Sequence, residues 1–308
     1  MTSFRSALIA ATAALSLAGP ALGAGCDKIT FSDVGWTDIT STTAVTTYML
    51  KALGYKTDIK VLSVPITYTS MAKGDVDVFL GNWMPSMEPN IAPYTKAGTV
   101  DTVRANLTGA KYTLATNKYG AAIGIKSYSD LAGHAKALDD KIYGIEPGND
   151  GNAIILKMIK ANFDNMKNFH LVESSEQGML AQVARLTKQK KPIVFLGWAP
   201  HPMNTKFQLT YLPGGEKYFG GDSTVYTNTR AGYVKDCPNV GQLLKNLVFT
   251  LPMENQIMGY ILDDGMKPQA AAVKWLKANP NAIKPWLAGV KTKDGGDAVA
   301  AVDKALKM

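Results

Sequence analysis

Residues 78–85 read VFLGNWMP and residues 194–200 read VFLGWAP, so one apolar word ending near a tryptophan and a proline occurs twice. A short run of large apolar residues is typical of a strand buried on both faces of a parallel sheet. Each word predicts such a strand, with Trp83 or Trp198 just beyond its carboxyl end. Ligands of open α/β sheets bind at the carboxyl ends of the strands. The repeated word therefore indicates two related halves that each present a tryptophan to a ligand.

The segments around the two words alternate between strand and helix patterns in the same order. The first half predicts strands at residues 28–32, 59–64 and 76–80 and helices at 40–53 and 66–73. The second half predicts strands at residues 141–146, 170–172 and 192–196 and helices at 153–163 and 177–187. This order predicts βαβ units. We therefore expect an α/β fold of two lobes, each a mostly parallel sheet flanked by helices, with a ligand in the cleft between them.

The chain must cross between the two lobes. We expect the crossings at residues 111–115 and 204–212, because these segments bracket the second set of strands and helices. Residues 25–111 and 207–308 would then form a discontinuous first lobe, and residues 112–206 the second.

The amino terminus has the pattern of a secretory signal peptide. Arg5 precedes an apolar stretch at residues 7–18, which a Gly-Pro break and small residues follow. We expect residues 1–24 to be cleaved and the protein to be periplasmic. Lipid attachment at Cys26 is an alternative, although Gly23 stands where a lipidation signal requires a bulky aliphatic residue.

The chain contains two cysteines, Cys26 and Cys237. An oxidising compartment allows them to form a disulfide, which would tie the mature amino terminus to the last third of the chain. Two buried thiols are the alternative, less favoured because an untied terminus frays.

Composition excludes several classes of protein. The 33 Lys and Arg outnumber the 25 Asp and Glu, but they are scattered rather than gathered into the stripe expected of a nucleic-acid binder. Three His leave little material for a metal site. After the first 25 residues, no apolar run approaches the ~20 residues that span a bilayer. We expect no metal, no cofactor and no nucleic-acid partner, and a monomer.

Three of the five tryptophans stand at matched places near predicted strand ends: Trp36, Trp83 and Trp198. A single tryptophan is usually core filling, but three at equivalent positions favour a ligand site. Trp faces are the best partners for a quaternary ammonium group, which has no N–H to donate. Trp275 and Trp286 lie in helical, proline-containing sequence and are interpreted as core residues.

The words GWTD (residues 35–38), LGNWMP (80–85) and GWAPHPMN (197–204) resemble the periplasmic substrate-binding proteins of ATP-binding-cassette importers for quaternary amines. Within that family the choline-binding proteins are the most similar, over essentially the whole mature chain. The resemblance implies a two-lobed fold that closes over choline and delivers it to a membrane permease, with acetylcholine as a weaker ligand. It also implies an aromatic cage formed by Trp36, Trp83, Tyr112 and Trp198. Two polar side chains, Asp38 and Asn149, would contact the other end of the ligand.

Other interpretations of these residues stay open at this stage. Asp38 and Asn149 each precede or begin a predicted helix and would serve equally well as helix caps. Tyr112 has little signal of its own, and a local structural hydrogen bond is favoured for His201. Glycine betaine or another quaternary amine is an alternative ligand. A secreted hydrolase of choline esters is the alternative of another class, although neither G-x-S-x-G nor H-E-x-x-H occurs.

Overall fold

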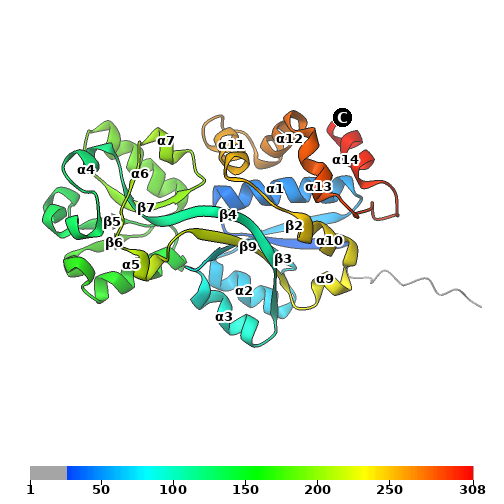
Figure 1. The fold of residues 1–308 in the computed structure, drawn as a ribbon, viewed down its shortest axis with the longest axis horizontal. Helices are drawn as coiled ribbons and strands as arrows, with labels where there is room; N and C mark the ends of the chain where they lie inside the picture. Colours follow the sequence, from blue (N-terminus) through cyan, green and yellow to red (C-terminus); the bar gives the residue numbers. More distant parts are fainter. Residues whose placement is uncertain (1–25, 308) are drawn as a thin grey trace, which may run out of the picture.

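The computed structural model of the protein describes residues 26–307, so the predicted signal peptide lies outside the described residues. Two groups of helices and strands lie side by side, and two long strands run between them (Figure 1). The expected α/β fold class with two lobes is confirmed. None of the helices in residues 26–307 is long and apolar enough to cross a membrane.

The strands form one hydrogen-bonded path in the order β2-β1-β3-β9-β4-β7-β5-β6, with β8 paired to β4. Strands β2, β1 and β3 are parallel, as are β7, β5 and β6, while β9 and β4 run antiparallel to their neighbours. The strands are β1 (Lys28–Asp33), β2 (Lys56–Val61), β3 (Val78–Met84), β4 (Val100–Thr116), β5 (Lys141–Tyr143), β6 (His170–Val172), β7 (Val194–Ala199), β8 (Thr210–Tyr211) and β9 (Ser223–Arg230).

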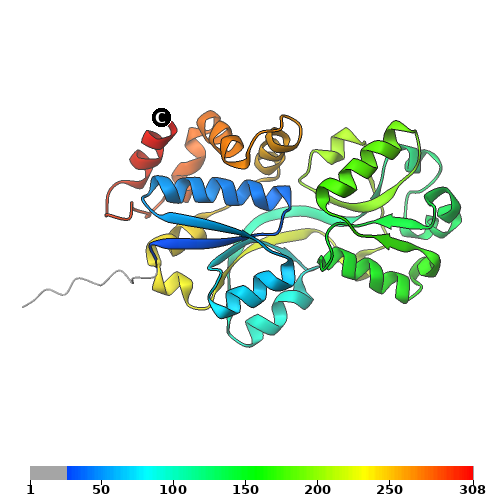
Figure 2. The ribbon, with the colours of Figure 1, turned by 180° about the vertical axis from the view of Figure 1, so that it is seen from behind.

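Helices cover both faces of the sheet in the first lobe (Figures 1 and 2). On one face, α1 packs against α11, α12 and α14, and on the other face α2 packs against α3. The helices of this lobe are α1 (Thr37–Ala52), α2 (Val64–Lys73), α3 (Glu88–Lys96), α9 (Tyr233–Asp236), α10 (Pro238–Asn246), α11 (Leu251–Leu262), α12 (Pro268–Ala278), α13 (Ile283–Trp286) and α14 (Ala298–Lys307), with a 3₁₀ turn at Pro280–Ala282.

The second lobe repeats this plan on a smaller scale, with α5 and α6 as its longest helices (Figure 1). Its helices are α4 (Lys118–Ala122), α5 (Asp150–Lys160), α6 (Glu176–Lys188), α7 (Met203–Lys206) and α8 (Glu216–Phe219), with 3₁₀ turns at Tyr128–Asp130, Ala132–Leu138 and Phe163–Asn168.

Strand β4 belongs to both lobes. Its residues 100–110 pair with β9, and its residues 111–116 pair with β7, which favours a first crossing near the predicted residues 111–115. For the second crossing, the pairing favours a later position than residues 204–212. Strand β8 still pairs with the β7 end of β4, and α8 packs against α5, so the chain returns only at the start of β9. We therefore propose residues 111–219 as the second lobe, instead of 112–206, and residues 26–110 and 220–307 as the first.

Several element boundaries also differ from those predicted. Trp83 and Trp198 lie inside β3 and β7 rather than beyond them, because antiparallel partners extend both ladders: Trp83 pairs with Val225 and Trp198 with Tyr112. Strand β2 ends three residues early, because Pro65 stands in the first turn of α2. Proline is tolerated there, since the first N–H groups of a helix have no partner within it.

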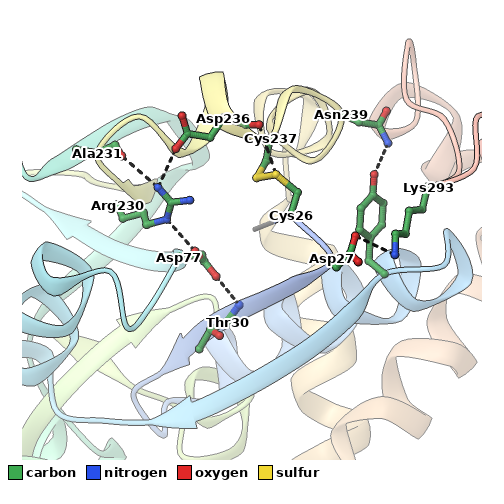
Figure 3. Close-up of a disulfide and its surroundings, with 11 residues drawn as sticks. Cys26, Asp27, Thr30, Asp77, Arg230, Ala231, Asp236, Cys237, Asn239 and Lys293 are labelled. Carbon is green, nitrogen blue, oxygen red and sulfur yellow. Dashed lines mark hydrogen bonds and ion pairs between the residues drawn. A yellow bond between two sulfur atoms is a disulfide. The ribbon is translucent and has the colours of Figure 1, made fainter. Parts of the chain in front are cut away.

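The predicted disulfide between Cys26 and Cys237 is present (Figure 3). It joins the chain just before β1 to the end of α9, and a partly exposed polar network lies beside it. Arg230 donates to Asp77 at 2.9 Å and to Asp236 at 3.0 Å, and Asp77 also accepts from the backbone N–H of Thr30. In this structure the Cys26 sulfur is bonded to Cys237, which disfavours the alternative of lipid attachment.

We predict that replacing both cysteines by serine lowers the free energy of unfolding by about 2–5 kcal/mol, because the unfolded chain gains the freedom that this long covalent loop removes. Guanidinium unfolding of the wild type with and without reductant provides the measurement. The double variant should match the reduced wild type and not respond to reductant. Equal midpoints for the oxidised wild type and the variant would contradict the prediction.

Candidate functional site

A buried cavity lies where β3, β4 and β7 meet the amino-terminal ends of α1 and α5. The space free of protein atoms there is about 260 Å³, counted together with any part of it that is open to solvent. No lining residue is more than 7% exposed, so the lobes are closed over it. The lining residues are Trp36, Asp38, Trp83, Tyr112, Ile145, Asp150 and Trp198.

The turn between β1 and α1 supplies two of these residues. Gly35 adopts a left-handed φ of 82°, which turns the chain so that Trp36 occupies the cap position of α1 and Asp38 its first turn. The cap residue of α1 is Trp36 and Asp38 lies within the helix, so the alternative interpretation of Asp38 as the helix cap is wrong. The Asp38 carboxylate instead accepts a hydrogen bond of 3.1 Å from the indole N–H of Trp83.

The other aromatic side chains come from paired strands. Tyr112 on β4 and Trp198 on β7 are direct cross-strand partners, which places their side chains on the same face of the sheet. The Tyr112 ring lies 5.7 Å from that of Trp83, tilted by 49°. The last peptide bond of each repeated stretch is cis, at Met84–Pro85 and Ala199–Pro200. The structure thus brings the four aromatic residues of the predicted cage together around one cavity.

The predicted contact residue Asn149 has a second role in the structure. Its Oδ1 caps α5 by accepting from the backbone N–H of Asn152 at 3.0 Å, and it also accepts from the Tyr112 hydroxyl at 3.2 Å. Asp150, one residue further, lines the cavity at this end. The capping alternative for Asn149 is therefore confirmed, and its contact with a ligand stays a prediction.

The cavity is acidic. Its lining contains two carboxylates, Asp38 and Asp150, and no Lys or Arg among the residues that the structure describes. Within the described chain, Oδ1 of Asp38 and Oδ2 of Asp150 have no hydrogen-bond partner. Burial, with the nearby charge of Glu176, raises the pKa of Asp38 to about 8, and burial raises that of Asp150 to about 6. Unpaired buried carboxylates favour a cationic ligand.

More carboxylates lie immediately behind this lining. Glu146 accepts a 2.9 Å hydrogen bond from the indole N–H of Trp36, and burial raises its pKa to about 7. Burial, and then the charge of Asp38, hold the pKa of Glu254 well above its ordinary value. The sequence does not single out Glu146, Glu254 or Ile145, because no motif marks them.

Two interpretations of residues outside the cage are confirmed. His201 makes the expected local hydrogen bond, accepting at Nδ1 from the backbone N–H of Met203 at 2.9 Å. Trp275 and Trp286 stack on each other in the core of the first lobe, 6.3 Å apart, and neither lines the cavity. Among residues 26–307, no group of three or more His, Cys, Asp or Glu is arranged to hold a metal ion.

Residues 27–278 match the family OpuAC, the substrate binding domain of ABC-type glycine betaine transport systems. The chain belongs to this family. An ABC-transporter choline binding protein in complex with choline is 62% identical, with a TM-score of 0.89 over 91% of this chain and 98% of that one. Lactococcal OpuAC in its closed-liganded conformation with glycine betaine is 27% identical, with a TM-score of 0.78 over 84% of this chain and 99% of that one.

The conformation of the lobes can also be compared. An ABC-transporter choline binding protein in an unliganded semi-closed conformation, again 62% identical, gives a TM-score of 0.83 over 92% of this chain and 99% of that one. The choline complex gives the higher value of 0.89. The present conformation is thus closer to the choline-bound structure, in agreement with the buried cavity.

We predict that the ligand-free protein loses stability as the pH rises from about 4 to about 8, and that Asp38→Asn loses part of this dependence. In that range the folded protein keeps a proton on Asp38, whose pKa is raised to about 8, whereas the unfolded chain releases it near 4. Melting temperatures of both proteins at pH 5–9 provide the measurement. The melting temperature of Asp38→Asn minus that of the wild type should increase with pH. A constant difference would contradict the prediction.

Proposed function

We propose that the protein captures choline outside the cytoplasm and delivers it to the permease of an ATP-binding-cassette importer. It is exported with a signal peptide that is then cleaved, and it acts as a monomer. The observation that carries this proposal is the closed cavity in which four aromatic side chains meet two carboxylates and no basic residue. The choline complex of a protein that is 62% identical supports choline among the quaternary amines.

The cavity suits a trimethylammonium group for a specific physical reason. Such a cation has no N–H, so ring faces and negative charges must hold it instead of hydrogen bonds. Desolvated cation–π contacts contribute about 2 kcal/mol each, and the closed lobes exclude water from Trp36, Trp83, Tyr112 and Trp198. In this arrangement the free Oδ1 of Asp38 accepts the hydroxyl hydrogen of choline.

The alternatives are less well supported. Glycine betaine ends in a carboxylate, which would face Asp38 and Asp150 as a like charge, with no Lys or Arg in the described lining to compensate. Hydrolysis of choline esters would require an activated nucleophile, and the family to which the chain belongs consists of substrate-binding domains of transport systems. We infer a binding protein without catalytic activity.

We predict that choline binds most tightly, acetylcholine more weakly and glycine betaine most weakly. Acetylcholine keeps the cation but has no hydroxyl hydrogen to donate, and its acetyl group needs extra room. Leaving a buried carboxylate beside Asp38 unpaired is unfavourable by about 1–3 kcal/mol or more. Calorimetry with the three ligands at one ionic strength provides the measurement. Asp38→Asn should narrow the gap between choline and betaine, and equal affinities in the wild type would contradict the proposal.

We also predict that Trp36→Ala, Trp83→Ala and Trp198→Ala each weaken choline binding by about 1–2 kcal/mol or more, because each removes a ring face from the cavity. Trp275→Ala is the matched control, since it deletes a buried tryptophan of the first lobe away from the site. It should lower the melting temperature but leave the dissociation constant unchanged. Normal binding by folded Trp198→Ala would contradict a cage built from both lobes.

A further inference from the structure

One buried polar contact joins the two lobes beside the cavity. Glu176, the first residue of α6 in the second lobe, is only 1% exposed. Its carboxylate accepts a 2.8 Å hydrogen bond from the backbone N–H of Thr37 and another from the Thr37 hydroxyl. Thr37 is the first residue of α1 in the first lobe, between the cavity residues Trp36 and Asp38.

This contact supplies what α1 lacks in its own lobe. The first N–H groups of a helix have no partner within it, and the aligned peptide dipoles give this end partial positive charge. No side chain of the first lobe caps α1. Glu176 provides both an acceptor and a negative charge there, and it does so from the other lobe. Separation of the lobes would return Thr37 and Glu176 to water.

His201 completes the arrangement from the second lobe. Because its Nδ1 accepts from the backbone N–H of Met203, the ring hydrogen must be on Nε2. The Nε2–H then donates to Oε1 of Glu176 at 3.2 Å. The His201 ring also packs edge-on against Trp198, with centroids 5.0 Å apart. Glu176 is thus linked to cavity residues of both lobes.

We propose that Glu176 is a positioning residue that stabilises the closed form through Thr37 and His201 and thereby slows ligand release. We call these three residues the interlobe latch. The inference rests on the proposed function, since it assigns a role in retaining the same ligand. It adds a residue that does not line the cavity and that no sequence motif marks.

An exposed ion pair between the lobes offers a contrast. Lys206 contacts Asp263 at 2.7 Å, but their side chains are 55% and 44% exposed. Exposed ion pairs contribute little, because water and salt screen them. The Glu176 carboxylate is excluded from water in the closed form, so removing one of its partners by substitution leaves a buried polar group unsatisfied there. The latch, rather than this pair, should determine how long the lobes stay closed.

The test compares Glu176→Gln and Thr37→Val with the wild type. Three donors converge on the two oxygens of Glu176, whereas glutamine has one acceptor oxygen and an amide that cannot accept. Thr37→Val removes one donor and leaves the charge of Glu176 in place. Asp139→Asn, an exposed site on the same lobe, is the control with the same change in charge.

Choline dissociation is followed by stopped-flow tryptophan fluorescence, and closure by small-angle X-ray scattering with choline at saturation. Glu176→Gln should release choline about tenfold faster or more, in the range of typical coupling energies between sites. Thr37→Val should change release in the same direction by a smaller factor, and both variants should be more open in scattering. Asp139→Asn should behave as wild type. In the double variant, the increase in the dissociation rate should be smaller than the product of the two single-variant factors, because both substitutions break the same contact.

Release at the wild-type rate from both latch variants would overturn the inference. So would an effect of Glu176→Gln alone, because it would then reflect the charge near Asp38 and not the contact with Thr37. If Glu176→Gln does not fold, Thr37→Val alone is the test: faster release of choline supports the inference, and release at the wild-type rate overturns it. Absence of choline binding by the wild type would overturn the proposed function instead. In that case scattering from the ligand-free proteins still tests the latch, and equal compactness of wild type and variants would overturn it.

Discussion

Two carboxylates that are buried without a cationic partner make closure of the empty cavity unfavourable. Asp38 and Asp150 line a cavity closed to water, and each has one oxygen without a hydrogen-bond partner in the described chain. Transfer of an ionised carboxylate out of water is unfavourable by several kcal/mol unless an opposite charge compensates. The empty protein therefore favours either protonation of these groups or separation of the lobes. An organic cation removes the conflict, which makes ligand binding and lobe closure one equilibrium.

The fold places these carboxylates and the rings at one point because equivalent elements of the two lobes end there. Asp38 and Asp150 stand in the first turns of α1 and α5, where the partial positive charge of a helix end stabilises negative groups. Trp83 and Trp198 stand near the carboxyl ends of β3 and β7. Strand β4 pairs with both lobes and adds Tyr112 between them.

The repeated sequence motifs predict the two-lobed fold and two of the cage tryptophans. They do not predict contacts between residues far apart in the chain. Matched apolar words were sufficient to predict the two-lobed fold and to single out Trp83 and Trp198, because periodicity and strand ends are local properties. The return of the chain at β9, as proposed above, lies later than the predicted crossing at residues 204–212, since the two-residue strand β8 has no distinct sequence pattern. Glu176 was missed for another reason. Its partner Thr37 is 139 residues away and meets it only when the lobes are closed.

In the function proposed here, the latch also explains why ligands that fit the cavity differently should stay bound for different times. Hydrogen bonds from N–H groups to oxygen span about 2.7–3.2 Å, and the contact from the Thr37 N–H to Glu176 is 2.8 Å. A ligand that holds Trp36 and Trp198 slightly too far apart would break this contact as well as its own. A ligand that brings a like charge to Asp38 would oppose closure before the contact forms. Closure of the lobes thus discriminates between ligands by both size and charge, and only a cation that fits the cage keeps the lobes closed.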